Sequence, residues 1–122
     1  MINNATPPVH VDATPTPTED AYEAFRRAET FFEAGRPDVA AELLLPALAA
    51  EPTNVASLEL LARAYLGSAQ LARAEQTLRR LVDLAPADAW ARFALARTLE
   101  RRSRADEAAS HRRIAAPLGL TG

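Results

Sequence analysis

Apolar residues recur at intervals of three and four along most of the chain, which is the period of an amphipathic helix. The first of these runs begins near Thr16 or Thr18 and ends at Gly35. Glycine is common just past the end of a helix, and Pro37 suits the first position of the next one. Further runs extend to about residue 116, and none alternates with the period of two expected of a strand. The pattern predicts six helices in three hairpins.

Capping residues indicate where several of these helices begin. Thr16 and Glu19 match a capping box before the first helix. Asn54 and Asp88 stand before the third and fifth helices, where a side-chain oxygen can accept a hydrogen bond from a free backbone N–H. Pro46 falls inside the second helix and is expected to kink it, because proline removes one backbone hydrogen bond.

The helical pattern repeats after 34 residues, as the distance from Pro52 to Pro86 first indicates. Equivalent positions of successive repeats mostly hold residues of similar size. The sets are Ala28, Ala62, Ala96; Phe31, Tyr65, Leu99; Gly35, Ala69, Ser103; Ala40, Ala74, Ala108; and Leu44, Leu78, Arg112. The two helices of a hairpin can approach closely only where the small residues lie, while the bulky residues fill the space between hairpins.

These positions resemble the tetratricopeptide repeat, a family whose helix A and helix B carry bulky and small residues in this order and end in a proline. The middle repeat, residues 55–88, matches best, at Leu58, Leu61, Ala62, Tyr65, Ala74, Leu78 and Pro86. The first repeat, residues 21–54, has Ala24 and Arg27 where bulk is expected. The third, residues 89–122, has Arg92, Arg112 and Leu120 at its two bulky positions and its proline position.

The resemblance covers about residues 19–116 and implies an all-α fold, an α-solenoid of three antiparallel helix hairpins in a right-handed superhelix. We expect one repeat domain at residues 18–122. Residues 1–17 are rich in threonine and proline and nearly lack large apolar groups, so we expect them to form a disordered tail. The degenerate third repeat is expected to end the array with a face that water accepts.

The composition mainly excludes certain kinds of site and certain classes of protein. The 122 residues include no cysteine, which excludes disulfides, thiolate metal sites and cysteine nucleophiles. All 14 basic residues are arginine, which is typical of a high-GC bacterial genome and leaves no catalytic or P-loop lysine. No stretch reaches the roughly 18 apolar residues of a membrane span, and the N-terminus lacks the regions of a signal peptide. A cytoplasmic protein without membrane contact is expected.

The sequence offers little catalytic chemistry. His10 lies in the N-terminal segment, and His111 lies in the last helix near Asp106 and Glu107. Ser110 is the direct neighbour of His111 and points elsewhere on a helix, so no triad is possible and we expect a solvated surface histidine. No glycine-rich phosphate loop is present, and paired carboxylates occur at helix starts, where the helix dipole favours them. The sequence predicts no enzyme, no metal site and no cofactor.

The candidate binding site is the concave wall of the solenoid, which the first helix of each hairpin lines. We expect it to bind a peptide segment or helix of a partner protein. Aromatic and arginine side chains anchor interfaces most often. For Phe25, Trp90 and Phe93 the sequence leaves both the groove and the core open. The candidate contacts are Tyr22, Phe25, Glu29, Glu33, Glu59, Arg63, Leu66, Trp90, Phe93, Arg97 and Arg101.

Arg63 and Arg97 lie one repeat apart on this wall, with Leu66 and Phe93 expected beside them. They favour a carboxylate-bearing ligand, or the acidic residues of this chain or of a second copy. Heat-shock chaperone binding, known in the family, needs lysine and asparagine at helix A positions and is not expected. Those positions hold Phe25, Glu29, Leu60, Trp90 and Ala94.

Charge adds an alternative function. Residues 1–60 hold ten acids and three arginines, whereas residues 61–122 hold six acids and eleven arginines. The acidic half of one chain could meet the basic half of another, so a self-assembling scaffold, either a homodimer or a larger oligomer, is the alternative to partner binding. Nucleic acid is a less favoured ligand, because the net charge is −2 and acids interrupt the arginine segments. Arg101, Arg102 and Arg104 fit either solvated charge at a helix end or part of a binding surface.

Overall fold

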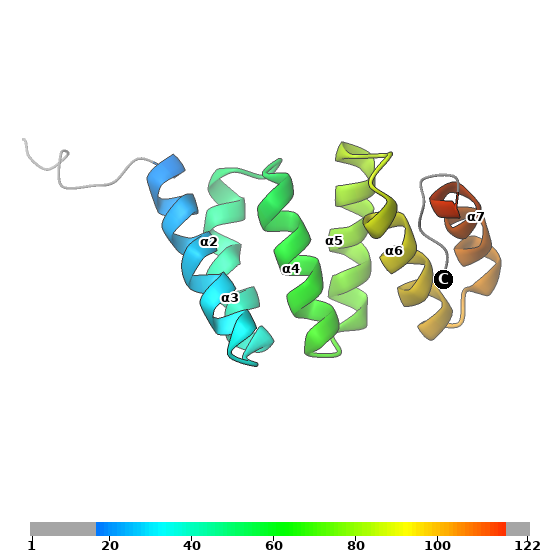
Figure 1. Ribbon diagram of the computed structural model, residues 1–122, viewed down its shortest axis with the longest axis horizontal. Coiled ribbons are helices and arrows are strands. Elements are labelled where there is room, and N and C mark those ends of the chain that lie inside the picture. Colours follow the sequence, from blue (N-terminus) through cyan, green and yellow to red (C-terminus); the bar gives the residue numbers. More distant parts are fainter. Residues whose placement is uncertain (1–16, 117–122) are drawn as a thin grey trace, which may run out of the picture.

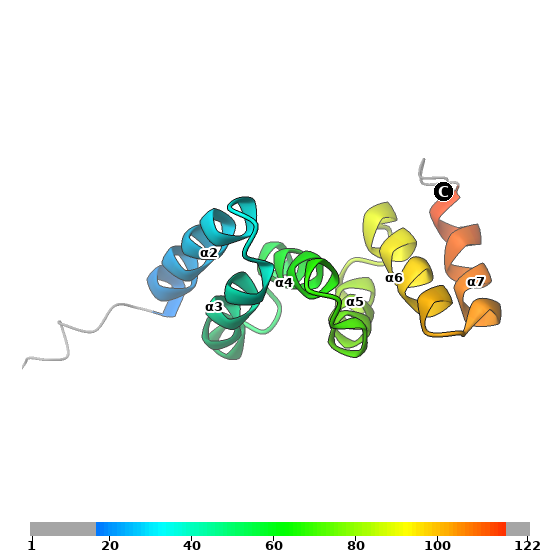
Figure 2. The ribbon, with the colours of Figure 1, turned by 90° about the horizontal axis from the view of Figure 1, so that it is seen from below.

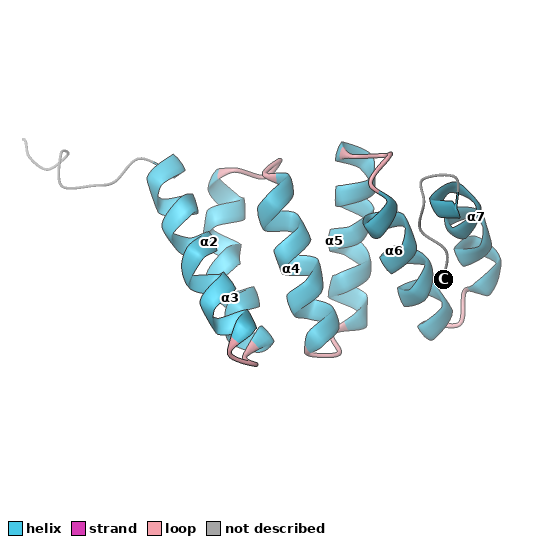
Figure 3. Ribbon diagram, in the orientation of Figure 1, coloured by secondary structure: helices cyan, strands magenta, loops and turns pink. Residues whose placement is uncertain are grey.

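The computed structural model describes residues 17–116, and these form six helices with no strand among them (Figures 1 and 3). The helices are α2 (Pro17–Glu33), α3 (Pro37–Ala50), α4 (Val55–Gly67), α5 (Leu71–Leu84), α6 (Ala89–Arg101) and α7 (Ala105–Ala115). Most of the predicted tail, the capping residue Thr16 and the last six residues, 117–122, lie outside the described range. None of the described helices is long and apolar enough to cross a membrane.

Successive helices pack as three antiparallel hairpins, α2–α3, α4–α5 and α6–α7, arranged along one axis (Figure 1). Figure 2 shows α2, α4 and α6 along one side of the array and α3 and α5 along the other. In that view α4 lies between α2 and α6. The predicted α-solenoid of three hairpins is confirmed. We name the surface formed by α2, α4 and α6 the A face.

The sequence signals for helix ends are confirmed where the structure describes them. The backbone N–H of Ser57 donates to the side chain of Asn54 at 3.1 Å, and that of Ala91 donates to Asp88 at 3.0 Å. Proline opens α3, and the same helix continues through Pro46. The kink expected at Pro46 stays a prediction.

A continuous core links the three hairpins. All six of the small residues matched at the repeat offset on the hairpin contacts are fully buried, which allows the close approach that the sequence predicts. Large buried side chains fill the layers between them, chiefly Leu44, Leu58, Leu78, Leu81, Leu95 and Leu99. The bulky position of the third repeat at Arg112 instead carries an ion pair with Glu100, at 2.8 Å.

Each hairpin turn contains one residue in the left-handed conformation. The φ angles are 81° at Gly35, 58° at Ala69 and 65° at Ser103, and these three residues are matched at the 34-residue offset. Only glycine adopts this region without strain, so the later two turns carry a cost that the first avoids.

Replacing Ala69 by glycine is therefore expected to stabilise the fold by about 0.5 to 1 kcal/mol, because the relief of strain exceeds the entropy that glycine adds to the unfolded chain. Gly35→Ala should destabilise by a similar amount, although the added Cβ would meet nothing within 4 Å. Urea unfolding followed by the fluorescence of Trp90, the one tryptophan in the sequence, measures both changes. A loss of stability in Ala69→Gly would contradict the expectation.

Candidate functional site

A stacked pair joins α4 to α6 on the A face. The guanidinium of Arg63 lies over the ring of Trp90, with its carbon 4.0 Å from the ring centroid. One turn earlier, Glu59 accepts hydrogen bonds from Nε and Nη2 of Arg63, at 3.2 Å and 2.9 Å. The attraction between a cation and an aromatic face and the ion pair together hold the guanidinium in one orientation. Its Nη1 group has no hydrogen-bond partner among the described residues and the side chain is 39% exposed.

The three aromatic residues left open by the sequence are each half-buried. Phe25 and Trp90 pack against the core with one side, so both belong partly to it. Phe93 lies beside two arginines, with Arg97 at 5.8 Å and Arg112 at 5.4 Å from its ring centroid. For Phe25 and Trp90 the groove and the core therefore do not exclude each other, because each ring packs against the core and keeps exposed surface.

A cavity of about 320 Å³ lies between α2 and the start of α4. We name it the Tyr22 pocket; its lining residues are Ala21, Tyr22, Phe25, Glu51, Asn54, Ala56 and Ser57. Tyr22 is 61% exposed, and its hydroxyl accepts a hydrogen bond from Arg26 at 3.0 Å. The hydroxyl oxygen of Ser57 is buried and has no partner within the described part of the chain. A buried unsatisfied hydroxyl costs about 1 to 3 kcal/mol, so a ligand atom that bonds to it would be favoured.

The other candidate contacts are distributed more loosely. Glu29 lies 3.5 Å from Arg26, and Leu66 is half-buried against the core. Glu33, Arg97 and Arg101 are exposed, and none of the three forms an ion pair with a described residue. The structure thus brings the candidates together in two places, at Arg63 and at the Tyr22 pocket.

A buried carboxylate that the sequence analysis missed joins the second repeat to the third. Glu75 in α5 is 6% exposed and accepts hydrogen bonds from Arg79 at 2.9 Å and Arg102 at 2.7 Å. It also pairs with Arg104, while Arg79 reaches Glu107 at 2.8 Å. The interpretation of Arg102 and Arg104 as solvated charge or binding surface is therefore corrected, because both hold Glu75.

The electrostatics of Glu75 follow from these partners. Burial raises the pKa of its carboxyl, but the hydrogen bonds from Arg79 and Arg102 and the charge of Arg104 outweigh burial and hold the pKa below its ordinary value. One sequence signal could have identified it: Glu75 falls on the apolar stripe of its helix, and the equivalent residue of the first repeat, Ala41, is 1% exposed.

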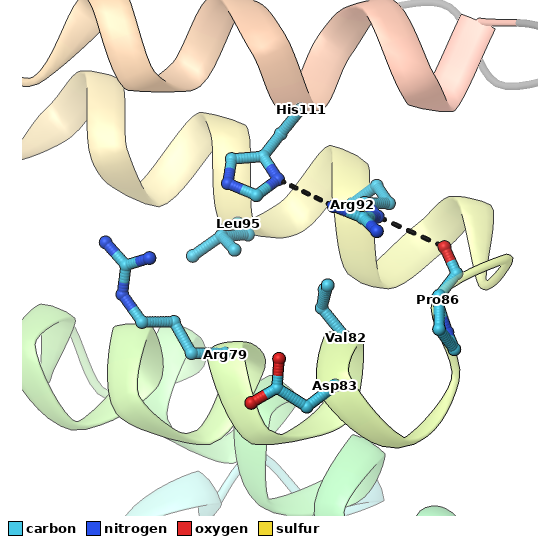
Figure 4. A pocket seen from close by; sticks show the side chains of 7 residues that line it. All are labelled: Arg79, Val82, Asp83, Pro86, Arg92, Leu95 and His111. Carbon is cyan, nitrogen blue, oxygen red and sulfur yellow. Dashed lines mark hydrogen bonds between the residues drawn. The ribbon is translucent and has the colours of Figure 1, made fainter.

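The expectation of a solvated His111 is wrong. The residue is half-buried, and its Nδ1 lies 3.2 Å from Nη1 of Arg92 (Figure 4). Burial lowers the pKa of the imidazole, and the charge of Arg92 lowers it further. Both residues line a second cavity, away from the A face residues named above. Within residues 17–116 no group of three or more histidine or acidic side chains could hold a metal ion.

Solved structures with this arrangement support the fold. MamA from Desulfovibrio magneticus RS-1 is 23% identical, with a TM-score of 0.75 over 83% of this chain and 57% of its own. MamA MSR-1 is 24% identical, with a TM-score of 0.76 over 89% of this chain and 63% of its own. This chain thus spans about three fifths of the length of these MamA chains.

A third similar structure is the second tetratricopeptide domain of Spaghetti (RPAP3), bound to an HSP90 peptide. It is 21% identical, with a TM-score of 0.76 over 82% of this chain and 93% of its own. No curated protein sequence matches significantly. The family model described as "Tetratricopeptide repeat" matches residues 31–89, from the end of α2 to the start of α6. Residues 31–89, just under half of the chain, are thus similar in sequence to the tetratricopeptide repeat.

Proposed function

We propose that the chain is a non-enzymatic protein-interaction module whose A face binds an acidic peptide segment or helix of a partner protein. The observation that carries this proposal is the fixed position of Arg63. Glu59 and Trp90 hold its guanidinium while Nη1 remains available, so a partner carboxylate can bind without ordering a mobile side chain. Arginine is also the side chain that pairs best with a carboxylate.

The Tyr22 pocket supplies the second half of the proposed site. Its apolar lining suits a hydrophobic side chain of the partner, and Ser57, whose hydroxyl has no partner among the described residues, is one of the lining residues. An acidic group at Arg63 and an apolar anchor in this pocket would place one ligand across the first two hairpins. Arg97 and Phe93 extend the same surface towards the third.

The RPAP3 domain gives a precedent for the binding mode and not for the ligand. That domain is bound to an HSP90 peptide. In this chain Phe25, Trp90 and Ala94 are among the residues at the positions that the family uses to grip such a peptide terminus. The proposed partner segment is therefore recognised by an acidic residue and an apolar anchor, and not through the chaperone clamp.

The double change Arg63→Glu/Arg97→Glu tests the proposal. Peptides selected from a random display library on the parent protein are expected to share an acidic residue and a large apolar residue. The double variant should bind these peptides at least about tenfold more weakly, because two attractions become repulsions. Fluorescence anisotropy of a labelled selected peptide measures the affinity.

Arg73→Glu/Arg113→Glu is the matched control. It makes the same change in net charge on exposed residues of α5 and α7, so binding should stay within about twofold of the parent. Equal loss in both variants, or unchanged binding in the first, would contradict the A face as the binding surface. Light scattering of the same proteins tests the homodimer, which stays a prediction.

A further inference from the structure

A second cavity, of about 470 Å³, lies where α5, α6 and α7 meet (Figure 4). We name it the Arg92 cavity; it is lined by Arg79, Val82, Asp83, Pro86, Arg92, Leu95 and His111. None of these residues belongs to the A face site proposed above. Their side chains converge from three helices and one turn, and Arg92 lies between His111 and Pro86 in the view of Figure 4.

The repeat provides an internal comparison for this cavity. The seven positions occur 34 residues earlier, at the junction of α3, α4 and α5, as Leu45, Leu48, Ala49, Pro52, Leu58, Leu61 and Thr77. There Leu58 is fully buried and Leu61 is 3% exposed, so apolar side chains fill the space. At the later junction the place of Leu58 is taken by Arg92, which turns to the carbonyl of Pro86 at 3.1 Å. The cavity therefore lies where the preceding junction is packed by leucine side chains.

The substitutions between the two junctions also change the chemistry. Arg79 replaces Leu45, Asp83 replaces Ala49 and His111 replaces Thr77. Four of the seven lining positions thus gain a charged or titratable group at one junction of an otherwise repeated backbone.

Arg92 is the positive charge that the surrounding residues do not neutralise. Arg79 is held by Glu75 at 2.9 Å and by Glu107 at 2.8 Å. The partners of Arg92 are a carbonyl oxygen and an imidazole nitrogen, and no carboxylate of residues 17–116 pairs with it. A half-buried guanidinium without a counter-ion favours the binding of an anion.

The residues that line the cavity favour one class of anion over others. Val82 is 7% exposed and Leu95 is 1% exposed, and both contribute apolar lining to the cavity. Asp83 makes no ion pair with a described residue, and its charge repels a dianion such as phosphate more than a monoanion. The volume lies within the range of about 300 to 1,000 Å³ that is typical of small-ligand sites.

We infer that the Arg92 cavity is a second binding site, which takes a monoanionic carboxylate with a small apolar body. The carboxylate pairs with Arg92 beside His111, and the apolar part lies against Val82 and Leu95. A free branched-chain acid and the C-terminal residue of a peptide present the same chemistry, so the experiment includes both.

The pKa of His111 should change when a ligand occupies this site. Its Nδ1 accepts from Arg92 only while the imidazole is neutral, and an imidazolium would be repelled by Arg92 from α6 and Arg79 from α5. Glu107 on its own helix and Asp83 across the cavity oppose that repulsion. A bound carboxylate offsets the charge of Arg92, so it raises the pKa of His111, and by linkage its own binding tightens as the pH falls.

The experiment is an NMR titration of the two histidine rings, with His111 assigned through His111→Gln and His10 as the second signal. Saturating isovalerate, N-acetyl-leucine or both should raise the pKa of His111 by about one unit, which corresponds to tenfold tighter binding below that pKa. Response to isovalerate alone identifies a free acid, and response to N-acetyl-leucine alone identifies a peptide end. No response to either, an equal response to neutral isovaleramide, or a larger one to phosphate overturns the proposal.

Arg92→Leu is the matched variant, because it restores the residue that fills the preceding junction. It should fold and melt no lower than the parent, while isovalerate binding weakens at least about tenfold. Arg92→Gln keeps a polar side chain and should lose binding as well, so the test stands if the leucine variant misfolds. Unchanged affinity in both variants overturns the proposal. The A face variant Arg63→Glu/Arg97→Glu should bind isovalerate as the parent does, which separates this site from the proposed function.

Discussion

Replacing Leu78 by alanine is expected to lower the free energy of unfolding by about 2 to 4 kcal/mol. Leu78 is fully buried in α5 and contributes to the core between the hairpins. Removing three carbon atoms loses their burial and leaves a cavity, which rigid helices on either side close only in part. For a chain of this length, such a loss is a large part of the whole stability.

Urea unfolding followed by Trp90 fluorescence measures this loss. Leu84→Ala is the matched control, since it makes the same chemical change at the end of the same helix on a residue that is 43% exposed. It should change stability by about 0.5 kcal/mol or less. Comparable losses in the two variants would mean that the repeat pattern does not locate the core.

Replacing Glu75 by glutamine is expected to destabilise the protein by about 1 to 3 kcal/mol. Glutamine keeps the shape of the side chain but removes the charge that binds Arg79, Arg102 and Arg104. Those arginine side chains are 39%, 37% and 43% exposed, so they can turn to water. The loss should therefore fall below the roughly 3 to 5 kcal/mol of a fully buried broken pair.

The pH dependence of the same variant has a definite sign. The pKa of Glu75 is lowered in the folded protein, so its contribution is complete above the unfolded value of about 4.3 and disappears as the pH falls through the folded value. The stability difference between parent and Glu75→Gln should shrink in that range. Urea unfolding at several pH values measures it. A stability difference between the two proteins that grows as the pH falls would contradict a lowered pKa for Glu75.

Glu100→Gln is the control for Glu75. Its carboxylate also pairs with an arginine, at 2.8 Å, but it is 38% exposed. An exposed pair contributes little to folding, so this variant should stay close to the parent at neutral pH. If it lost as much as Glu75→Gln, burial would not be what makes Glu75 important.

The helices and hairpins could be predicted because their causes are local. Asn54 and Asp88 cap the helices that follow them directly, and Gly35 ends its own helix. The repeat offset then aligned small with small residues, which is enough to pair neighbouring helices. These signals act within a few residues or at one fixed period, so the sequence alone displays them.

The site depends on contacts that have no such period. Arg63 lies over Trp90, 27 residues later, because a flat ring from the next hairpin is within its reach. Glu75 meets Arg102, which is also 27 residues away, through a turn whose place only the folded array defines. In the sequence, the Arg92 cavity is indicated only by arginine at the repeat position where the preceding repeat has Leu58.

Both junctions between hairpins contain buried alanine and leucine, and the second one adds the Glu75 ion cluster. Contacts between ions weaken in concentrated salt, whereas contacts between apolar groups weaken in the cold. In a linear array each hairpin depends only on its neighbours. Concentrated salt should thus weaken the attachment of the last hairpin more than that of the first, so that unfolding in salt begins at the C-terminal hairpin.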